Sequence, residues 1–161
     1  MPAELEIREV AYAHDDAQAL IARVQQVYVE RYGGADDDPM EASMFARPSG
    51  AFFVGYLGDL PVVTGAWRAE GVDRLGSNRT AEIKRMYVVP EAARQGHARA
   101  MLAYLENDAL AAGFDVMVLS TGSLQPEAIE LYLTAGYAPV APFGHYADAP
   151  LVRCFAKRLE G

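Results

Sequence analysis

The sequence is poor in cysteine, in basic charge and in long apolar runs. Cys154 is the single cysteine, which excludes a disulfide within the chain, and its setting VRCFAKRL favours a small residue packed in a strand over a nucleophile, since no base is evident beside it. The 14 Lys and Arg residues against 22 Asp and Glu residues give a net charge of -8, which argues against nucleic-acid binding. No apolar run approaches the roughly 20 residues of a membrane span, so no membrane partner is expected.

The sequence shows no pattern typical of a targeting segment, a linker or a repeat. MPAELEIREV at the N-terminus lacks the basic-then-apolar plan of a signal peptide, so a cytoplasmic location is expected. No linker or repeat interrupts the 161 residues, of which 52% are hydrophobic. We therefore expect a single folded domain over residues 1–161.

What is present is an alternation of strand and helix patterns. Strands are expected at residues 4–11, 51–56, 61–68, 83–89, 114–120, 137–140 and 151–159. Helices are expected from Asp15 to the Gly33-Gly34 pair, and at residues 39–45, 98–112 and 128–135. Because a helix connects the strands at 83–89 and 114–120, these two should be parallel, while the remaining strands should be antiparallel.

The turn between the strand at 83–89 and the next helix is the strongest candidate for a ligand site. It contains Gly96 and Ala98, two small residues that let backbone N–H groups approach something bulky. A helix begins there with unpaired donors and the positive end of its dipole, so the expected ligand is an anion such as a phosphate. The alternative is simple turn geometry, for which a glycine is also common.

This stretch resembles motif A of the GNAT acyltransferases, Q/R-x-x-G-x-G/A, with Gly96 and Ala98 in the small positions. Ala93 stands where the family has Gln or Arg, and Arg94 follows it. Further matches to small bacterial single-domain GNAT proteins occur in the expected order: GAWR at 65–68, AEIKRMYVVP at 81–90, STGSLQPEAIELYLTAGY at 120–137, and PFG-x-Y followed by CFAK. Before about residue 45 only the strand-helix-helix plan matches.

The resemblance implies an α/β fold with a mixed sheet of six or seven strands, about four flanking helices and a splayed central parallel pair. A bulge near Met86 or Tyr87 would begin the splay, and an open cleft beside the strand would explain Lys84 and Arg85. The cosubstrate would be acetyl-CoA, with no metal. The residues implied in holding it are Met86, Tyr87, Val88, Arg94, Gln95, Gly96, His97, Ala98, Arg99 and Gln125.

Two residues are candidates for catalysis by resemblance. Glu82 would be the base that frees the amine, and on a regular strand it shares a face with Met86. The alternative is a surface carboxylate that pairs with Lys84 or Arg85. Tyr132 would donate a hydrogen bond to the departing thiolate; the alternative is a tyrosine packed in the core.

The implied activity is transfer of an acetyl group to a primary amine, such as an amino acid or a polyamine, by direct attack in a ternary complex. Residues that could wall the acceptor pocket, or pack in the core instead, are Phe52, Trp67, Tyr28, Tyr32 and Tyr146. His145 is a further candidate for the pocket, and its alternative is a solvated histidine in a loop. The acidic turn 35–38 is either a solvated loop or a rim that attracts a cationic substrate. Rival functions are a protein or peptide acetyltransferase and a non-catalytic acyl-CoA-binding regulatory module. A homodimer is compatible with all of these functions.

Overall fold

The computed structural model describes residues 4–160. Its strands are β1 (Leu5–Val10), β2 (Gly50–Leu57), β3 (Leu60–Ala69), β4 (Thr80–Val88), β5 (Val116–Gly122), β6 (Ala138–Val140) and β7 (Val152–Arg158). Its helices are α1 (Asp15–Tyr32), α2 (His97–Ala111) and α3 (Pro126–Thr134), with short 3₁₀ turns η1 (Ala42–Phe45) and η2 (Pro90–Ala92). No helix within residues 4–160 combines the length and the apolar character needed to cross a membrane.

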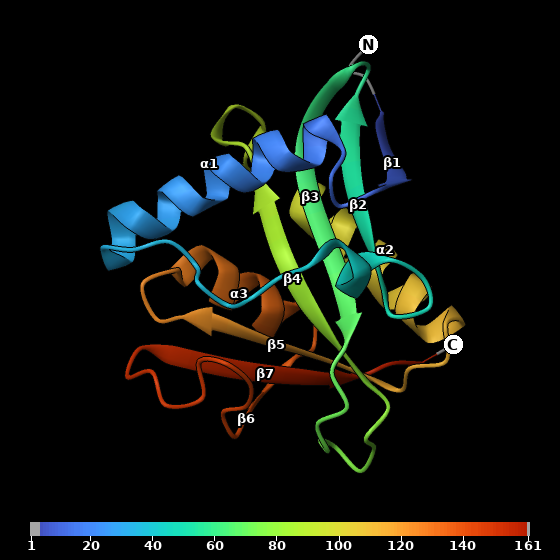
Figure 1. The fold of residues 1–161 in the computed structure, drawn as a ribbon, viewed down its shortest axis with the longest axis vertical. Helices are drawn as coiled ribbons and strands as arrows, with labels where there is room; N and C mark the ends of the chain where they lie inside the picture. Colours follow the sequence, from blue (N-terminus) through green and yellow to red (C-terminus); the bar gives the residue numbers. More distant parts are fainter. Residues whose placement is uncertain (1–3, 161) are drawn as a thin grey trace.

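The strands form one mixed sheet in the order β1-β2-β3-β4-β5-β7-β6 (Figure 1). Among these seven strands only β4 and β5 are parallel, as expected for strands joined by a helix. α1 crosses one face of the sheet and α2 lies behind the other (Figure 1). This confirms the α/β class and the seven-stranded form of the predicted sheet.

Of the four predicted helices, three form α-helices within residues 4–160, and the fourth, predicted at 39–45, is shorter than expected. The segment 39–45 folds only as the single turn η1, which has an extended N-cap residue, Glu41, without a capping hydrogen bond. A single turn offers too few hydrogen bonds to offset the cost of helix nucleation by itself. Phe45 is nevertheless buried, so the turn is held by packing.

The core on the α2 side explains how this helix is fixed against the sheet. Met101 and Leu105 of α2 are fully buried. A Cβ on Gly65 of β3 would come within 2.7 Å of Met101 Cγ and 2.9 Å of Leu105 Cδ1. The helix therefore packs on bare backbone, which sets the position of its N-terminus next to the end of β4.

The parallel pair at the centre of the sheet separates soon after it begins. β4 and β5 are paired only at Thr80–Glu82 and Val116–Val118, and beyond that point the ribbons diverge (Figure 1). In the ladder with β3, Thr64 faces Tyr87 while Ala66 faces Lys84, so β4 contains one extra residue in this interval. The bulge and the splay are both confirmed, and they leave backbone groups of β4 after Glu82 without partners on the β5 side.

Candidate active site

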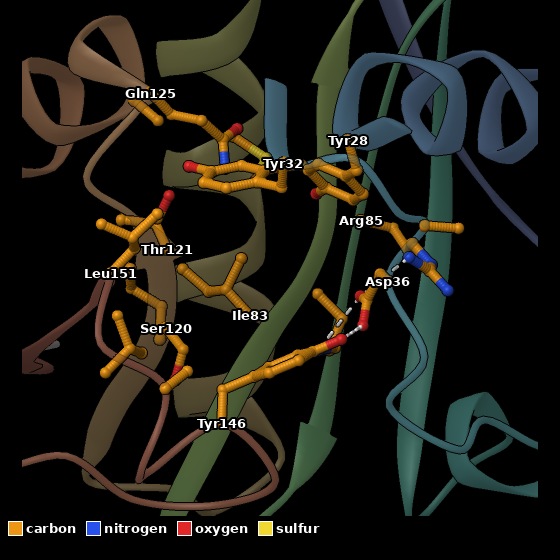
Figure 2. Close-up of a pocket in the computed structure, with 18 of the residues that line it drawn as sticks. Tyr28, Tyr32, Asp36, Ile83, Arg85, Ser120, Thr121, Gln125, Tyr146 and Leu151 are labelled. Carbon is orange, nitrogen blue, oxygen red and sulfur yellow. Dashed lines mark hydrogen bonds and ion pairs between the residues drawn. The ribbon is translucent and has the colours of Figure 1, made fainter. Parts of the chain in front are cut away.

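A cavity of about 360 Å³ occupies the space where β4 and β5 separate. Its walls come from β4 and β5, from the end of α1 with the loop after it, from the start of α3, and from residues 149–152 (Figure 2). Because these segments are far apart in the sequence, the cavity depends on the whole fold. Of the residues predicted to hold the cosubstrate, Met86 and Gln125 line it.

Tyrosines form much of the wall. Tyr28 and Tyr32 reach the cavity from α1, and Tyr146 reaches it from the loop before β7 (Figure 2). Burial raises the pKa of Tyr28 to about 12, so its hydroxyl stays protonated at neutral pH. The Tyr32 hydroxyl accepts a hydrogen bond from the Leu124 backbone N–H at 3.1 Å and lies against Gly122, where any Cβ would collide with it.

The acidic turn lies over β4 and is tied to it by ion pairs. Asp36 Oδ2 is 3.0 Å from Arg85 Nη1, and Asp38 Oδ2 is 3.1 Å from Lys84 Nζ and 2.7 Å from Arg68 Nη2. Burial works to raise the pKa of Asp36, but the attraction of Lys84 and Arg85 and the hydrogen bonds from Tyr146 and the Asp38 backbone together outweigh it, so the net pKa is lowered. The turn is therefore neither a solvated loop nor a free acidic rim. It supplies the partners that the cationic residues of β4 require.

Asp36 and its neighbour Asp37 also interact with the loop before β7. The Tyr146 hydroxyl donates to Asp36, and His145 Nε2 is 2.9 Å from Asp37 Oδ1 (Figure 2 shows Tyr146 reaching Asp36). His145 itself does not line the cavity. The turn thus connects α1, β4 and the loop before β7.

Glu82 is buried beside the turn rather than in the cavity wall. Its Oε1 accepts a hydrogen bond from Arg68 Nε at 2.9 Å, and burial raises its pKa above the ordinary glutamate value. The expectation that Glu82 shares a face with Met86 is wrong, because the extra residue at the bulge brings Tyr87, and not Met86, onto the face of Lys84. The partner of Glu82 is Arg68, not Lys84 or Arg85 as its structural alternative assumed.

Tyr132 lines the cavity from α3 and is only 4% exposed. Its ring packs edge to face on Tyr137, with centroids 5.6 Å apart. Burial raises the pKa of Tyr132 above its usual range. Within residues 4–160 its hydroxyl has no hydrogen-bond partner, so the donor is available to a ligand.

The predicted anion loop is exposed and adopts an unusual backbone. Arg94 has φ 63° and Gly96, the N-cap residue of α2, has φ 84°. Among the described residues, nothing lies within 4 Å of a Cβ built on Gly96, and no side chain caps the helix. The loop is therefore open to solvent with free donors at the helix start.

Apart from Met86 and Gln125, the residues predicted to hold the cosubstrate lie outside the cavity wall. These are Tyr87, Val88, Arg94, Gln95, Gly96, His97, Ala98 and Arg99. His97 Nε2 is 3.2 Å from Gln95 Oε1, and Arg99 Nη2 donates to Thr134 Oγ1 at 2.5 Å. The last bond ties α2 to α3.

Two predicted pocket residues are placed in the core. Phe52 is fully buried and packs edge to face on Phe45. Trp67 is fully buried as well, and its Nε1 donates to Asp108 Oδ2 at 2.7 Å. Neither lines the cavity, so the structure does not bring them together with Tyr28 and Tyr146.

Sequence reasoning missed several residues of the wall. Ser120 and Thr121 lie at the carboxyl end of β5, and Leu151 precedes β7. A signal existed for the first two, because ligands in sheets of this kind bind beyond the carboxyl ends of parallel strands. Among residues 4–160, no cluster of three or more His, Cys, Asp and Glu side chains is arranged to hold a metal ion.

Comparisons with known proteins agree with this geometry. Residues 21–137 match the Acetyltransferase (GNAT) family. The chain is 30% identical over 145 residues to an IAA acetyltransferase from Azospirillum brasilense, covering 90% of this chain and 92% of that protein.

Solved structures with the same fold support this result. A predicted acyl-CoA N-acyltransferase from Klebsiella pneumoniae subsp. pneumoniae MGH 78578 superposes with a TM-score of 0.77 at 25% identity, over 97% of this chain and 98% of that one. The structure of yncA from Salmonella typhimurium with its cofactor acetyl-CoA has a TM-score of 0.70 at 16% identity, over 99% and 96% of the two chains, and so supports the fold alone. The chain belongs to the GNAT acetyltransferase family and is an acyltransferase.

Proposed function

We propose that this protein transfers the acetyl group of acetyl-CoA to the primary amine of a small molecule, by direct attack in a ternary complex. The observation that carries the proposal is the cavity beside the unpaired part of β4, where an extended thioester arm and an amine can meet. Residues 1–161 would act as one domain, in the cytoplasm.

The residues that would hold acetyl-CoA fit its two chemical parts. The free amides at the start of α2, with Gly96 and Arg94 beside them, suit a diphosphate. Unpaired backbone groups of Met86–Val88 and the Gln125 side chain suit the amides of the pantetheine arm. Acetyl-CoA supplies the activated acyl group as a thioester.

Glu82 is the proposed base. A primary amine with a pKa near about 10.4 is mostly protonated at neutral pH, so a proton acceptor near the cavity helps to free it. The raised pKa of Glu82 makes its carboxylate a stronger base than an exposed glutamate. Because Glu82 does not line the cavity, a bridging water would complete the path.

Tyr132 is the proposed donor to the leaving thiolate. Tyr132 lines the cavity, its hydroxyl has no partner among the described residues, and its raised pKa keeps the proton on the phenol. A hydrogen bond to the developing sulfur charge is therefore its role, rather than complete proton transfer.

The size of the cavity supports a small acceptor. Tyr28, Tyr32 and residues 34–36 line it, and its volume of about 360 Å³ is suited to a small amine.

The proposal is tested by measuring acetyl-CoA consumption with panels of amino acids, polyamines, aminoglycosides and peptides, alongside coenzyme A binding by calorimetry. Turnover with small amines supports it. Turnover with peptides alone would favour a protein acetyltransferase instead. Tight binding of acetyl-CoA with no turnover on any amine would favour a regulatory acyl-CoA-binding module.

A further inference from the structure

The cavity wall at the bulge of β4 contains a cation whose hydrogen bonds are incomplete. Arg85 lines the cavity, and only 4% of its side chain is exposed. Nη1 donates to Asp36, but Nε is buried and has no partner among residues 4–160. Buried donors are almost always paired in native proteins, and a ligand that is not present is one physical reason for an exception.

The nearby carboxylates of Asp36 and Asp38 are already paired with cationic side chains. Asp36 accepts from Arg85, from the Tyr146 hydroxyl and from the Asp38 backbone N–H, and Lys84 Nζ lies 3.7 Å away. Asp38 Oδ2 forms ion pairs with both Lys84 and Arg68. An entering cation would compete with Arg85, Lys84 and Arg68 for these carboxylates, whereas an entering anion would meet donors of Arg85 that Asp36 does not take.

The backbone at this point is also strained. Arg85 has φ 58°, a left-handed conformation that is unfavourable for an L residue with a Cβ. This conformation belongs to the bulge, and Figure 2 shows the guanidinium of Arg85 beside Asp36. Strain of this kind is characteristic of ligand sites.

We infer that the acceptor amine also bears a carboxylate, as an amino acid does, and that Arg85 binds this carboxylate while Lys84 adds positive charge nearby. The inference rests on the proposed function, since it names the substrate class of the same cavity. The remaining walls, which include Ile83, Leu119 and Leu151, suit an apolar side chain. A polyamine or an aminoglycoside brings only positive charge and leaves Arg85 without its partner.

The test compares matched acceptors that differ only at the carboxylate: leucine, leucinamide and 3-methylbutylamine, and the corresponding set for phenylalanine. Rates are compared per concentration of unprotonated amine, because an amide lowers the pKa of the neighbouring amine. We expect kcat/KM to be at least about tenfold higher for the carboxylate member, which corresponds to about 1.4 kcal/mol. Equal or better use of the amides would overturn the inference and leave the proposed acetyltransferase function intact.

Two variants separate the role of the cation from the role of the ion pair. Arg85→Gln removes the cation and should reduce the preference for the carboxylate to within about threefold. Asp36→Asn breaks the same ion pair but keeps the guanidinium, and it should retain the preference. A preference that survives Arg85→Gln, or that is lost equally in both variants, contradicts the assignment of the carboxylate to Arg85.

A binding measurement gives a readout that does not depend on turnover. The melting temperature of the wild-type protein saturated with coenzyme A should rise with leucine or phenylalanine and should rise less with their amides. If no amine is acetylated, the proposed function fails, and this shift still decides the inference. An equal shift, or no shift, with both members of each pair overturns it.

Discussion

Tyr132 and Tyr137 are in edge-to-face contact, yet their hydroxyls differ in a way that matters for function. The Tyr137 hydroxyl donates to Glu106 Oε2 at 2.8 Å, whereas the Tyr132 hydroxyl has no partner within residues 4–160 and Tyr132 lines the cavity. A hydroxyl without a partner adds little to stability, because removing it breaks no bond. Its presence at the cavity wall is better explained by a ligand.

Replacing Tyr132 by Phe should therefore slow turnover about tenfold or more while it leaves the melting temperature and the affinity for coenzyme A nearly unchanged. Tyr137→Phe is the matched control: it should lower the free energy of unfolding by about 1 to 2 kcal/mol and leave turnover intact. Steady-state kinetics and urea unfolding of both variants check this. Unchanged turnover in Tyr132→Phe would assign the sulfur contact to another group.

Glu82→Gln should reduce kcat/KM most strongly below the pKa of the amine. At high pH the free amine is already neutral, so the loss should shrink. In the wild type, burial holds the pKa of Glu82 above its ordinary value, and activity should fall as the pH decreases through that raised pKa. The measurement is a pH profile of kcat/KM.

Glu106→Gln is the control for this profile, because Glu106 is also poorly exposed and pairs with Lys157 but does not line the cavity. Its profile should match that of the wild type. An equal loss of activity at every pH in Glu82→Gln would assign Glu82 a positioning role through Arg68.

At the scale of single elements, the start of α2 and the bulged strand β4 form complementary halves of the site. α2 is held by packing on the bare backbone of β3 at Gly65, so its exposed N-terminus keeps a fixed relation to the unpaired end of β4. A helix N-terminus held in this way presents its amides without further reorganisation.

Gly96→Glu should weaken coenzyme A binding by at least about a hundredfold, because a carboxylate and a Cβ would occupy the place of the diphosphate. Gly113→Glu is the matched control. Gly113 has φ 101° at the other end of α2, and no atom of residues 4–160 would lie within 4 Å of a Cβ added there, so the substitution brings comparable backbone strain away from the loop. Calorimetric titration with coenzyme A decides, and equal affinities of the two variants would refute the anion loop.

At the scale of the whole molecule, an acidic chain keeps its site close to electrical neutrality. The net charge is -8, but Arg68, Lys84 and Arg85 are balanced by Asp36, Asp38 and Glu82 under the turn after α1. These ion pairs join segments that are distant in the sequence. Acidic residues elsewhere also accept from buried side chains, as Asp108 does from Trp67 and Glu106 from Tyr137.

Asp38→Ala should lower the free energy of unfolding by about 3 kcal/mol, because it leaves Arg68 and Lys84 largely buried without this partner. Asp37→Ala is the matched control next to it. Asp37 is 79% exposed and its ion pair is with the partly exposed His145, so its loss should have little effect. Urea unfolding of both variants checks this, and equal effects would mean that the turn is not held by Asp38.

The periodicity of the sequence and its small-residue loop determined the strand order along the chain, the parallel crossover and the family. These depend on local propensity, on turn residues and on a motif contained in a few consecutive positions. Gly96 and Ala98, for example, are recognisable without any knowledge of their neighbours.

Only the tertiary structure decided which side chains meet in the cavity. It placed Phe52 and Trp67 in the core, paired Glu82 with Arg68, and brought Asp36 to Arg85 across 49 positions of the chain. An extra residue in β4 reverses which side chains share a face, and an ion pair depends on distance in space. Neither the position of the bulge nor the partners of the ion pairs can be read from the order of residues, because both arise only when separate segments pack against one another.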